Sequence, residues 1–200
     1  IYIIRFRNTM DSPRHARFIR GYGYQGSAGP QFDFDAQGFG GGYKQAVVAG
    51  TYGISVGAFG ECLARDDNFV SIDPELKDAW GIPALHISMT QGENEKAMME
   101  DAASAGAEML EAAGAKNIRV HSALAEPGMA IHELGIARMG NDPKRSVTDQ
   151  WTQLYDVPNV FAMDGACFVS SGCQNPTLTM MAIAVRSCDH LIQRFKRNEI

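Results

Sequence analysis

The sequence predicts an α+β fold, and three observations lead to this prediction. Segments rich in aromatic residues and glycine follow one another through residues 1–63, with no long helical pattern between them. Successive strands of this kind favour an antiparallel sheet. Two later segments, residues 93–115 and 177–197, repeat apolar side chains at helical spacing and predict long helices.

The sheet is predicted from alternating polarity. Residues 1–8 and 16–26 alternate apolar and polar side chains and carry several aromatic rings, which suits two half-buried strands. Residues 26–42 are rich in glycine and predict a loop. Residues 46–63 predict further strands, with glycines where backbones crowd or turn.

Two helices are predicted after the strands. Asp73 as N-cap, Pro74 in the first turn and Gly81 as the stop predict a short helix over residues 73–81. The longer segment, residues 93–115, stops at Gly114 and presents one apolar face to the rest of the protein. That face consists of Met98, Ala102, Ala105, Met109 and Ala113.

The chain changes character near His121, where loops replace the regular patterns. Residues 132–151 and 166–176 predict loops, and residues 159–165 predict a short strand that ends in Asp-Gly. We therefore expect a domain boundary between residues 120 and 121.

The closing helix, residues 177–197, is amphipathic. Arg194, Lys196 and Arg197 lie at its C-terminus, where the helix dipole favours cations. Its predicted apolar face consists of Met180, Ile183, Ala184, Cys188, Leu191 and Phe195.

Composition and charge narrow the classes of function. Hydrophobic residues make up 45% of the chain and charged residues 20%, which is ordinary for a globular protein. A net charge of −5 provides no basic surface for nucleic acid, and no apolar run is long enough to span a membrane. The chain opens inside an apolar run at Ile1, without a signal peptide, so we expect it to be a portion of a longer protein.

The four cysteines predict neither a disulfide scaffold nor a zinc site, because they show no C-x-x-C spacing. They are Cys62, Cys167, Cys173 and Cys188, and buried free thiols are the favoured interpretation. Cys167 and Cys173 are close enough in sequence to pair in an oxidising compartment, so the redox compartment stays open.

Gly21, Gly23 and Gly26 match the G-x-G-x-x-G fingerprint of dinucleotide-binding loops. That fingerprint requires a strand before it and a helix opening from it, because the helix N-terminus holds the pyrophosphate. Here Ser-Ala-Gly-Pro follows, with no helical period. We therefore interpret the motif as a glycine-bearing strand, and expect any main dinucleotide-binding loop to lie outside these residues.

Candidate chemistry is concentrated in the last third of the chain. His132 lies in Ile-His-Glu-Leu-Gly-Ile-Ala-Arg-Met-Gly, Asp164-Gly165 ends the predicted strand, and Asn175-Pro176 precedes the closing helix. Singly, each is more typical of a structural histidine or a turn. Their order and spacing are what indicate a catalytic site.

Residues 132–190 resemble the C-terminal signature of the glucose–methanol–choline oxidoreductases. The shared elements are H-x-x-G-x-x-R-M-G, D-P-x-x-S-V-x-D, a strand ending in Asp-Gly, and N-P-x-x-T before a helix. Ile136 stands where that family usually has threonine. The resemblance implies FAD-dependent oxidation of an alcohol, with hydride transfer to the flavin. It also implies a substrate-binding domain over residues 1–120 and the C-terminal part of an FAD-binding domain over residues 121–200.

The resemblance implies a role for each candidate residue. His132 would accept the hydroxyl proton, for which an imidazole with an ordinary pKa near 6.5 is suited. Asn175 would donate from its amide to the same oxygen. Pro176 and Thr177 would face the flavin edge at the positive end of the closing helix. Asp164 and Gly165 would lie along the ribityl chain and pyrophosphate.

The substrate and partners are less closely defined by the sequence. Residues 57–87 and the helix after them resemble the sugar and glucoside dehydrogenase branch, which implies a sugar or glycoside substrate, an accompanying small subunit, a c-type cytochrome acceptor and export to the periplasm. Arg20, Gln25 and Glu61 are candidates for contacts with sugar hydroxyls. An oxidase that uses oxygen and a non-catalytic sugar-binding module remain alternatives.

Overall fold

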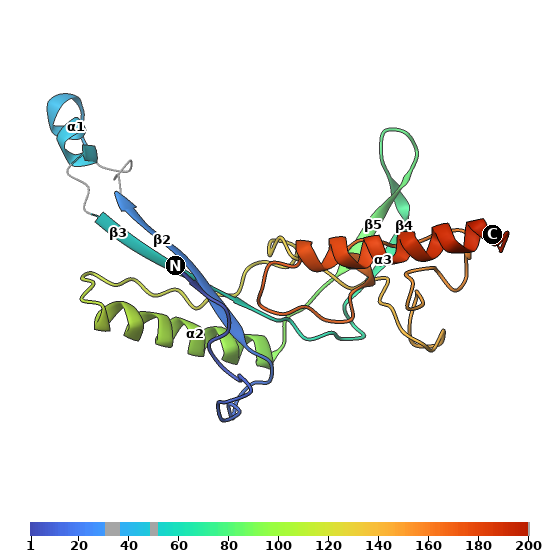
Figure 1. Cartoon of the computed structure of the whole chain (residues 1–200). Helices are drawn as coiled ribbons and strands as arrows, with labels where there is room; N and C mark the ends of the chain where they lie inside the picture. Colours follow the sequence, from blue (N-terminus) through green and yellow to red (C-terminus); the bar gives the residue numbers. More distant parts are fainter. Residues whose placement is uncertain (31–36, 49–51, 200) are drawn as a thin grey trace.

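The computed structural model describes residues 1–30, 37–48 and 52–199. Figure 1 shows an elongated molecule with helix α2 in one half and helix α3 in the other. Loops connect the two halves. The elements in chain order are β1 (Tyr2–Ile3), β2 (Tyr22–Pro30), α1 (Gly40–Val48), β3 (Tyr52–Gly60), β4 (Phe69–Lys77), β5 (Pro83–Ser88), α2 (Glu93–Ala112), the 3-10 turn η1 (Gly165–Cys167) and α3 (Thr177–Lys196). Helices and antiparallel sheets are therefore combined as the α+β prediction requires.

The main sheet has the strand order β1-β2-β3, and both pairings are antiparallel. Gln25 lies opposite Tyr2 on one side and Gly57 on the other, while Phe59 lies opposite Gly23. Residues that oppose one another across an antiparallel pair point to the same face, and successive residues alternate between faces. Gln25, Gly57 and Phe59 therefore share one face of the sheet, which we call the Gln25 face.

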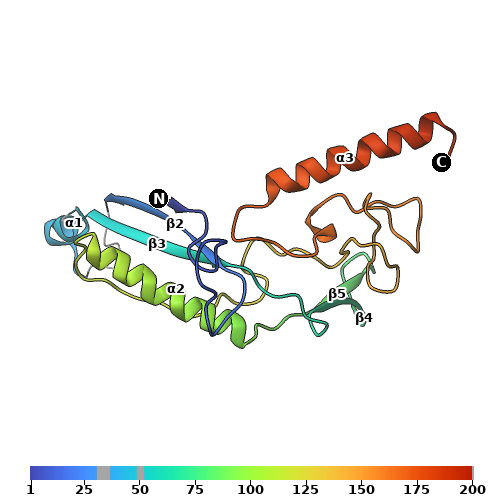
Figure 2. The ribbon, with the colours of Figure 1, turned by 60° about the horizontal axis from the view of Figure 1, so that its bottom comes forward.

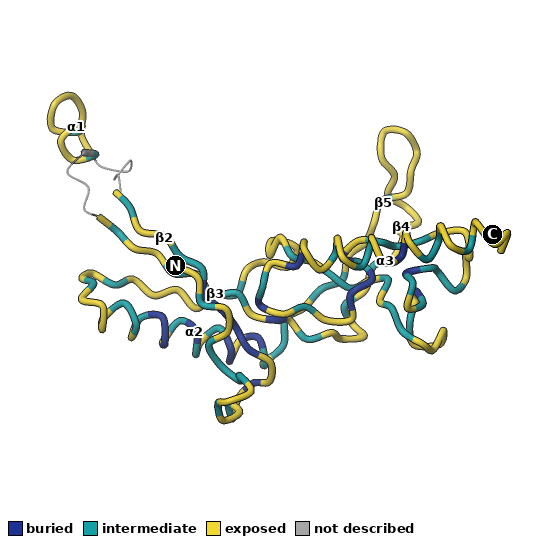
Figure 3. Tube along the Cα trace, in the orientation of Figure 1, coloured by how far each residue is buried: buried dark blue, intermediate teal, exposed yellow. Residues whose placement is uncertain are grey.

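The other face of the sheet packs against α2, as the turned view in Figure 2 shows. Its aromatic side chains Tyr22 and Tyr24 are buried, and the Tyr24 hydroxyl donates to the carbonyl of Ala102 at 2.6 Å. Buried residues concentrate where α2 crosses the sheet (Figure 3). This core cluster comprises Phe18, Tyr22, Tyr24, Ala97, Met98 and Ala102.

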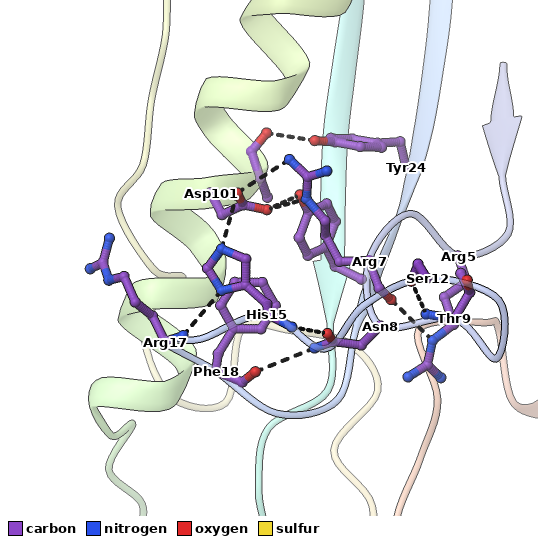
Figure 4. A network of polar contacts seen from close by, with 12 residues as sticks. Arg5, Arg7, Asn8, Thr9, Ser12, His15, Arg17, Phe18, Tyr24 and Asp101 are labelled. Carbon is purple, nitrogen blue, oxygen red and sulfur yellow. Dashed lines mark hydrogen bonds and ion pairs between the residues drawn. The ribbon is translucent and has the colours of Figure 1, made fainter.

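A polar network around Asp101 holds residues 5–18 against α2 (Figure 4). The Asp101 carboxylate accepts from Arg7 Nε at 2.8 Å and from the Tyr22 hydroxyl at 2.5 Å, and His15 Nε2 lies 3.7 Å away. Burial alone would raise the pKa of Asp101, but the hydrogen bonds from Arg7 and Tyr22 lower it below its ordinary value. The ionised carboxylate therefore joins two distant segments of the chain.

The long helix is confirmed. Helix α2 spans Glu93–Ala112, and Gly114 follows it in the left-handed conformation at φ +83°, which explains the stop. At its start, the Gly92 amide donates to Glu95 Oε2 at 2.7 Å. The predicted apolar face is also largely confirmed, since Met98, Ala102 and Ala105 are buried.

The short helix predicted over residues 73–81 is wrong, because those residues belong to the β4–β5 hairpin. Asp73 Oδ1 accepts from the amides of Glu75 and Leu76 where the strand register shifts, so it caps a bulge instead of a helix. Gly81, at φ +83°, belongs to the hairpin turn. Capping aspartates and left-handed glycines serve turns as well as helix ends, which misled the prediction.

Several predicted boundaries also need correction. Only Tyr2–Ile3 of residues 1–8 is a strand, and the strand predicted over residues 16–26 begins at Tyr22 and runs on to Pro30, into the predicted loop. Helix α1 occupies Gly40–Val48, where a loop and a strand were expected. Residues 31–36 of that loop and 49–51 of that strand lie outside the described part of the chain.

Gly23 and Gly26 of the glycine motif lie in β2, as predicted, and Gly21 directly precedes the strand. A Cβ atom on Gly23 would come within 2.6 Å of the Ile3 carbonyl oxygen, so the glycine permits close approach of the N-terminal segment. Backbone crowding at this position explains why the residue is glycine.

The closing helix is confirmed as α3, with Arg194 and Lys196 in its last turn and Arg197 as its C-cap. Its packing is lighter than predicted. Ser187 is buried, whereas Cys188 and Phe195 of the predicted apolar face are exposed. The strand predicted over residues 159–165 is wrong: Phe161 forms one isolated bridge with Gln153, and no strand is assigned to that range.

Candidate active site

His132 lies in a loop whose backbone is unusual on both sides of it. Ile131 and Ile136 adopt φ angles of +58° and +29°, which β-branched residues rarely occupy. Such conformations persist only where surrounding contacts enforce them, and they concentrate at functional sites. One enforcing contact is local, since the Ala130 amide donates to Glu133 Oε1 at 2.8 Å.

The loop after His132 runs along the turn η1. The amides of Gly135, Ala137 and Met139 donate in turn to the carbonyls of residues 165, 166 and 167, at 3.1, 3.0 and 2.9 Å. Asp164 caps this turn, because its Oδ1 accepts from the Ala166 amide at 2.9 Å. These contacts join the His132 loop to the predicted cofactor-binding residues Asp164 and Gly165.

Gly165 lies in the narrow space between that loop and α3. It is buried, and a Cβ atom there would come within 2.8 Å of Met180 Cε and closer still to the Leu134 side chain. Leu134 is two residues from His132, and Met180 lies in the first turn of α3. The glycine therefore allows the histidine loop and the helix N-terminus to pack together.

Asn175 lies in a loop that is fixed to the N-terminal segment. The Cys173 thiol and the Gln174 side-chain amide both donate to the Ile4 carbonyl, at 3.0 and 2.7 Å. The side chain of Asn175 then meets the sheet directly, since its Oδ1 accepts from Gln25 Nε2 at 3.1 Å.

His132 meets the same sheet through an aromatic contact. Its imidazole centroid lies 6.2 Å from that of Phe59, with the rings tilted by 41°. Gln25 and Phe59 are diagonal neighbours on the Gln25 face, a relationship that corresponds to roughly 7–8 Å between backbone positions. The structure therefore brings His132 and Asn175 to one face of the β2–β3 pair. There His132 contacts Phe59 and Asn175 contacts the neighbouring Gln25.

The floor of the Gln25 face is open at Gly57. A Cβ atom placed on Gly57 would meet only the Gln25 backbone oxygen, at 3.8 Å. The φ angle of Gly57 lies outside the left-handed region, so strand geometry does not require glycine at this position. The residue leaves room directly beside Gln25, which sequence reasoning did not identify.

Two other predicted substrate residues form a separate pair. Arg20 Nε lies 3.5 Å from Glu61 Oε1, and the Glu61 side chain is only 8% exposed. Burial raises the pKa of Glu61, while Arg20 and Arg5 oppose this effect. Glu61 lies four residues after Gly57, about 13 Å of extended chain, so this pair is not grouped with Gln25.

The N-terminus of α3 directly follows Asn175. Pro176 is buried and acts as the N-cap residue, and among the described residues no side chain caps the helix. Thr177 and the next two residues are exposed. Their backbone amides come before the first amide that has an acceptor within the helix. Free amide donors and the positive end of the helix dipole suit an electron-rich oxygen or nitrogen edge, such as that of a reduced flavin.

The cysteines carry no disulfide. All four thiols are free, with Cys167 and Cys173 buried and Cys62 and Cys188 exposed. Burial raises the pKa of both buried thiols, which keeps them protonated at neutral pH.

Residues 1–30, 37–48 and 52–199 contain neither a cluster of metal ligands nor a membrane-spanning helix. Groups of three or more His, Cys, Asp or Glu side chains placed to hold a metal ion do not occur there. The helices of this described part also include none that is both long and apolar enough to cross a bilayer.

Comparison with known proteins identifies a family for this chain. The GMC oxidoreductase family model matches residues 64–184, which include His132, Asp164 and Asn175. A 2-methyl-1,2-propanediol dehydrogenase from Mycolicibacterium austroafricanum is 39% identical over 68% of this chain and 25% of its own length. A 6'''-hydroxyparomomycin C oxidase from Streptomyces lividus is 35% identical over 60% of this chain and 22% of its own length. A gluconate 2-dehydrogenase flavoprotein from Pantoea cypripedii is 29% identical over 77% of this chain and 26% of its own length. The chain thus spans about a quarter of the length of these relatives.

Proposed function

The chain belongs to the GMC oxidoreductase family, and on this premise we propose that the protein oxidises an alcohol group of a sugar or glycoside with FAD as its cofactor. One observation carries the proposal. His132 contacts Phe59, and Asn175 contacts Gln25, on the same face of the β2–β3 pair. A general base and a hydrogen-bond donor therefore converge on one region, beside the open floor at Gly57.

The two residues have complementary roles in this proposal. His132 accepts the hydroxyl proton of the substrate, since a neutral imidazole is a base suited to neutral pH. Asn175 donates from Nδ2 to the same oxygen and remains uncharged, so it stabilises the alkoxide as negative charge develops. FAD, when bound, supplies the acceptor for the hydride that leaves the substrate carbon.

The residues after Asn175 fit the requirements of that cofactor. Pro176 and Thr177 would hold the flavin edge at the uncapped N-terminus of α3. Asp164 and Gly165 would lie along the ribityl chain and pyrophosphate, next to the His132 loop. The word flavoprotein in the name of the Pantoea relative supports the choice of cofactor.

The names of two relatives support a sugar-like substrate. One relative is named for gluconate and another for 6'''-hydroxyparomomycin C. Residues 1–120 would form the substrate-binding domain, with Gln25 close to the reacting group and the Arg20–Glu61 pair farther along the strands. A small subunit, a c-type cytochrome acceptor and a periplasmic location stay predictions from resemblance.

Anaerobic mixing tests this proposal. The FAD-loaded enzyme is mixed with a sugar, a glycoside, a sugar acid and a small diol, and the visible flavin absorbance is followed. We expect loss of absorbance with at least one of these alcohols. Readmitted oxygen then distinguishes an oxidase, which recovers rapidly, from a dehydrogenase. A protein that binds sugar without retaining or reducing a flavin would instead be the sugar-binding module.

A further inference from the structure

We infer that Gln25 is a positioning residue that sets the orientation of the Asn175 amide, and this inference rests on the proposed function of Asn175. The observation is the hydrogen bond from Gln25 Nε2 to Asn175 Oδ1, at 3.1 Å. Sequence reasoning had placed Gln25 among the residues that contact substrate. Its side-chain amide is instead directed at the catalytic asparagine.

The orientation of Asn175 decides what it offers to the substrate. An asparagine amide has an acceptor oxygen on one side and a donor NH₂ on the other. With Oδ1 turned toward Gln25, Nδ2 is turned away from it and remains available as a donor. The opposite rotation would present Oδ1 to a developing alkoxide, and the two electron-rich oxygens would repel each other.

Other contacts hold the backbone of the loop in place. Cys173 and Gln174 bind the Ile4 carbonyl independently of Gln25. Gln25 itself is fixed by strand pairing with Tyr2 on one side and Gly57 on the other. Loss of its side-chain amide should therefore change the rotation of Asn175 and leave the fold intact.

Gln25→Glu provides a nearly isosteric test. A carboxylate can only accept, so Nδ2 of Asn175 would turn toward it and the donor to the substrate would be lost. Losing one such donor typically slows reactions by about 10²-fold or more, and we expect this fall in flavin reduction at about pH 8. At about pH 5 a growing fraction of the introduced carboxyl is protonated and donates to Oδ1 again. The ratio of variant to parent rate should therefore rise as the pH falls.

Three further variants complete the experiment. Ser27→Glu adds the same charge two residues along the Gln25 face, and we expect an unchanged rate. Gln25→Met lacks the side-chain amide and cannot be charged, so it should be slower than the parent with a rate ratio that does not depend on pH. In an Asn175→Ala background, Gln25→Glu should have no additional effect, because the residue through which it acts is absent. Unfolding temperature and FAD content are measured for each variant.

The outcomes distinguish failure of the Gln25 role from failure of the Asn175 role. A pH-independent ratio for Gln25→Glu, or an effect that persists without Asn175, would overturn the positioning role. If Asn175→Ala itself reduces flavin at the parent rate, the proposed function of Asn175 fails first. If Asn175→Ala reduces flavin slowly while the Gln25 variants reduce it at the parent rate, only the inference about Gln25 is overturned.

Discussion

The ring of Phe59, on strand β3, packs against the imidazole of His132 with 6.2 Å between their centroids. The two residues come from distant parts of the chain, one in the sheet and one in a loop. Phe59 also lies diagonally across the strand pair from Gln25, which binds Asn175. A single strand pair therefore supports both members of the proposed catalytic pair.

Phe59→Ala should slow flavin reduction without loss of FAD. Removal of the ring leaves the imidazole free to adopt other rotamers, and misplacement of a reacting group by about 1 Å can cost as much as 10²-fold. We expect a fall of about tenfold or more in the rate of reduction at saturating substrate, measured by stopped flow. Phe59→Tyr retains the ring and serves as the control. Equal rates for Phe59→Ala and the parent enzyme would show that the contact does not orient His132.

Gly57→Val should raise KM for a sugar while leaving the fold intact. The valine side chain would occupy the open floor beside Gln25, where a Cβ atom meets no side chain. A steric change of this size in a binding site is typically worth about 10-fold or more in kcat/KM. β-Branched residues suit strands better than glycine, so the unfolding temperature should be unchanged or higher.

The control for this prediction is Ser55→Val, one pair farther along the same face. It should leave KM unchanged. A small diol should also be affected less than a sugar by Gly57→Val. Equal KM values for the sugar in the parent and the Gly57→Val enzyme would mean that substrate does not lie on this floor.

Asp101→Asn should destabilise the protein at neutral pH and reduce its sensitivity to acid. The hydrogen bonds from Arg7 and Tyr22 outweigh burial and lower the pKa of Asp101, so this carboxylate stabilises the fold above its unfolded pKa of about 3.9. That contribution is lost as the pH falls through the lowered folded value. Because Arg7 is partly exposed, we expect a loss of only about 1–2 kcal/mol at neutral pH.

Unfolding temperatures measured between neutral pH and about pH 3 check this sign. The difference between Asp101→Asn and the parent should be largest at neutral pH and shrink in acid. Glu100→Gln removes the neighbouring exposed carboxylate that pairs with Arg17, and should change stability little. A difference that grows in acid would contradict the assigned role of Asp101.

Local signals predicted some elements well. Helix α2 followed from apolar spacing and from Gly114, and α3 from a similar period after Pro176. The same local signals failed at Asp73 and Gly81, where pairing with β5 overrides the helix propensity. Short-range patterns cannot show which distant segment completes the hydrogen bonds of a strand.

The same limit applies to the candidate site. The spacing of His132, Asp164 and Asn175 indicated the family, because a signature of this kind is linear in sequence. The contact of Gln25 with Asn175 and that of Phe59 with His132 depend on strand register and loop path. Phe59 could have been noticed as an aromatic residue within the strand predicted over residues 46–63, but its partner could not. The assignment of roles to these residues stays a prediction.

The most direct test of the account is the rate of flavin reduction in His132→Ala. We expect the variant to keep its FAD and its unfolding temperature, because the loop backbone is held by Gly135, Ala137 and Met139. Loss of a general base typically costs about 10² to 10⁴-fold, and stopped-flow mixing with substrate should show a decrease of that size. Reduction at a rate near that of the parent enzyme would contradict the assignment of His132 as the base, and with it the proposed mechanism.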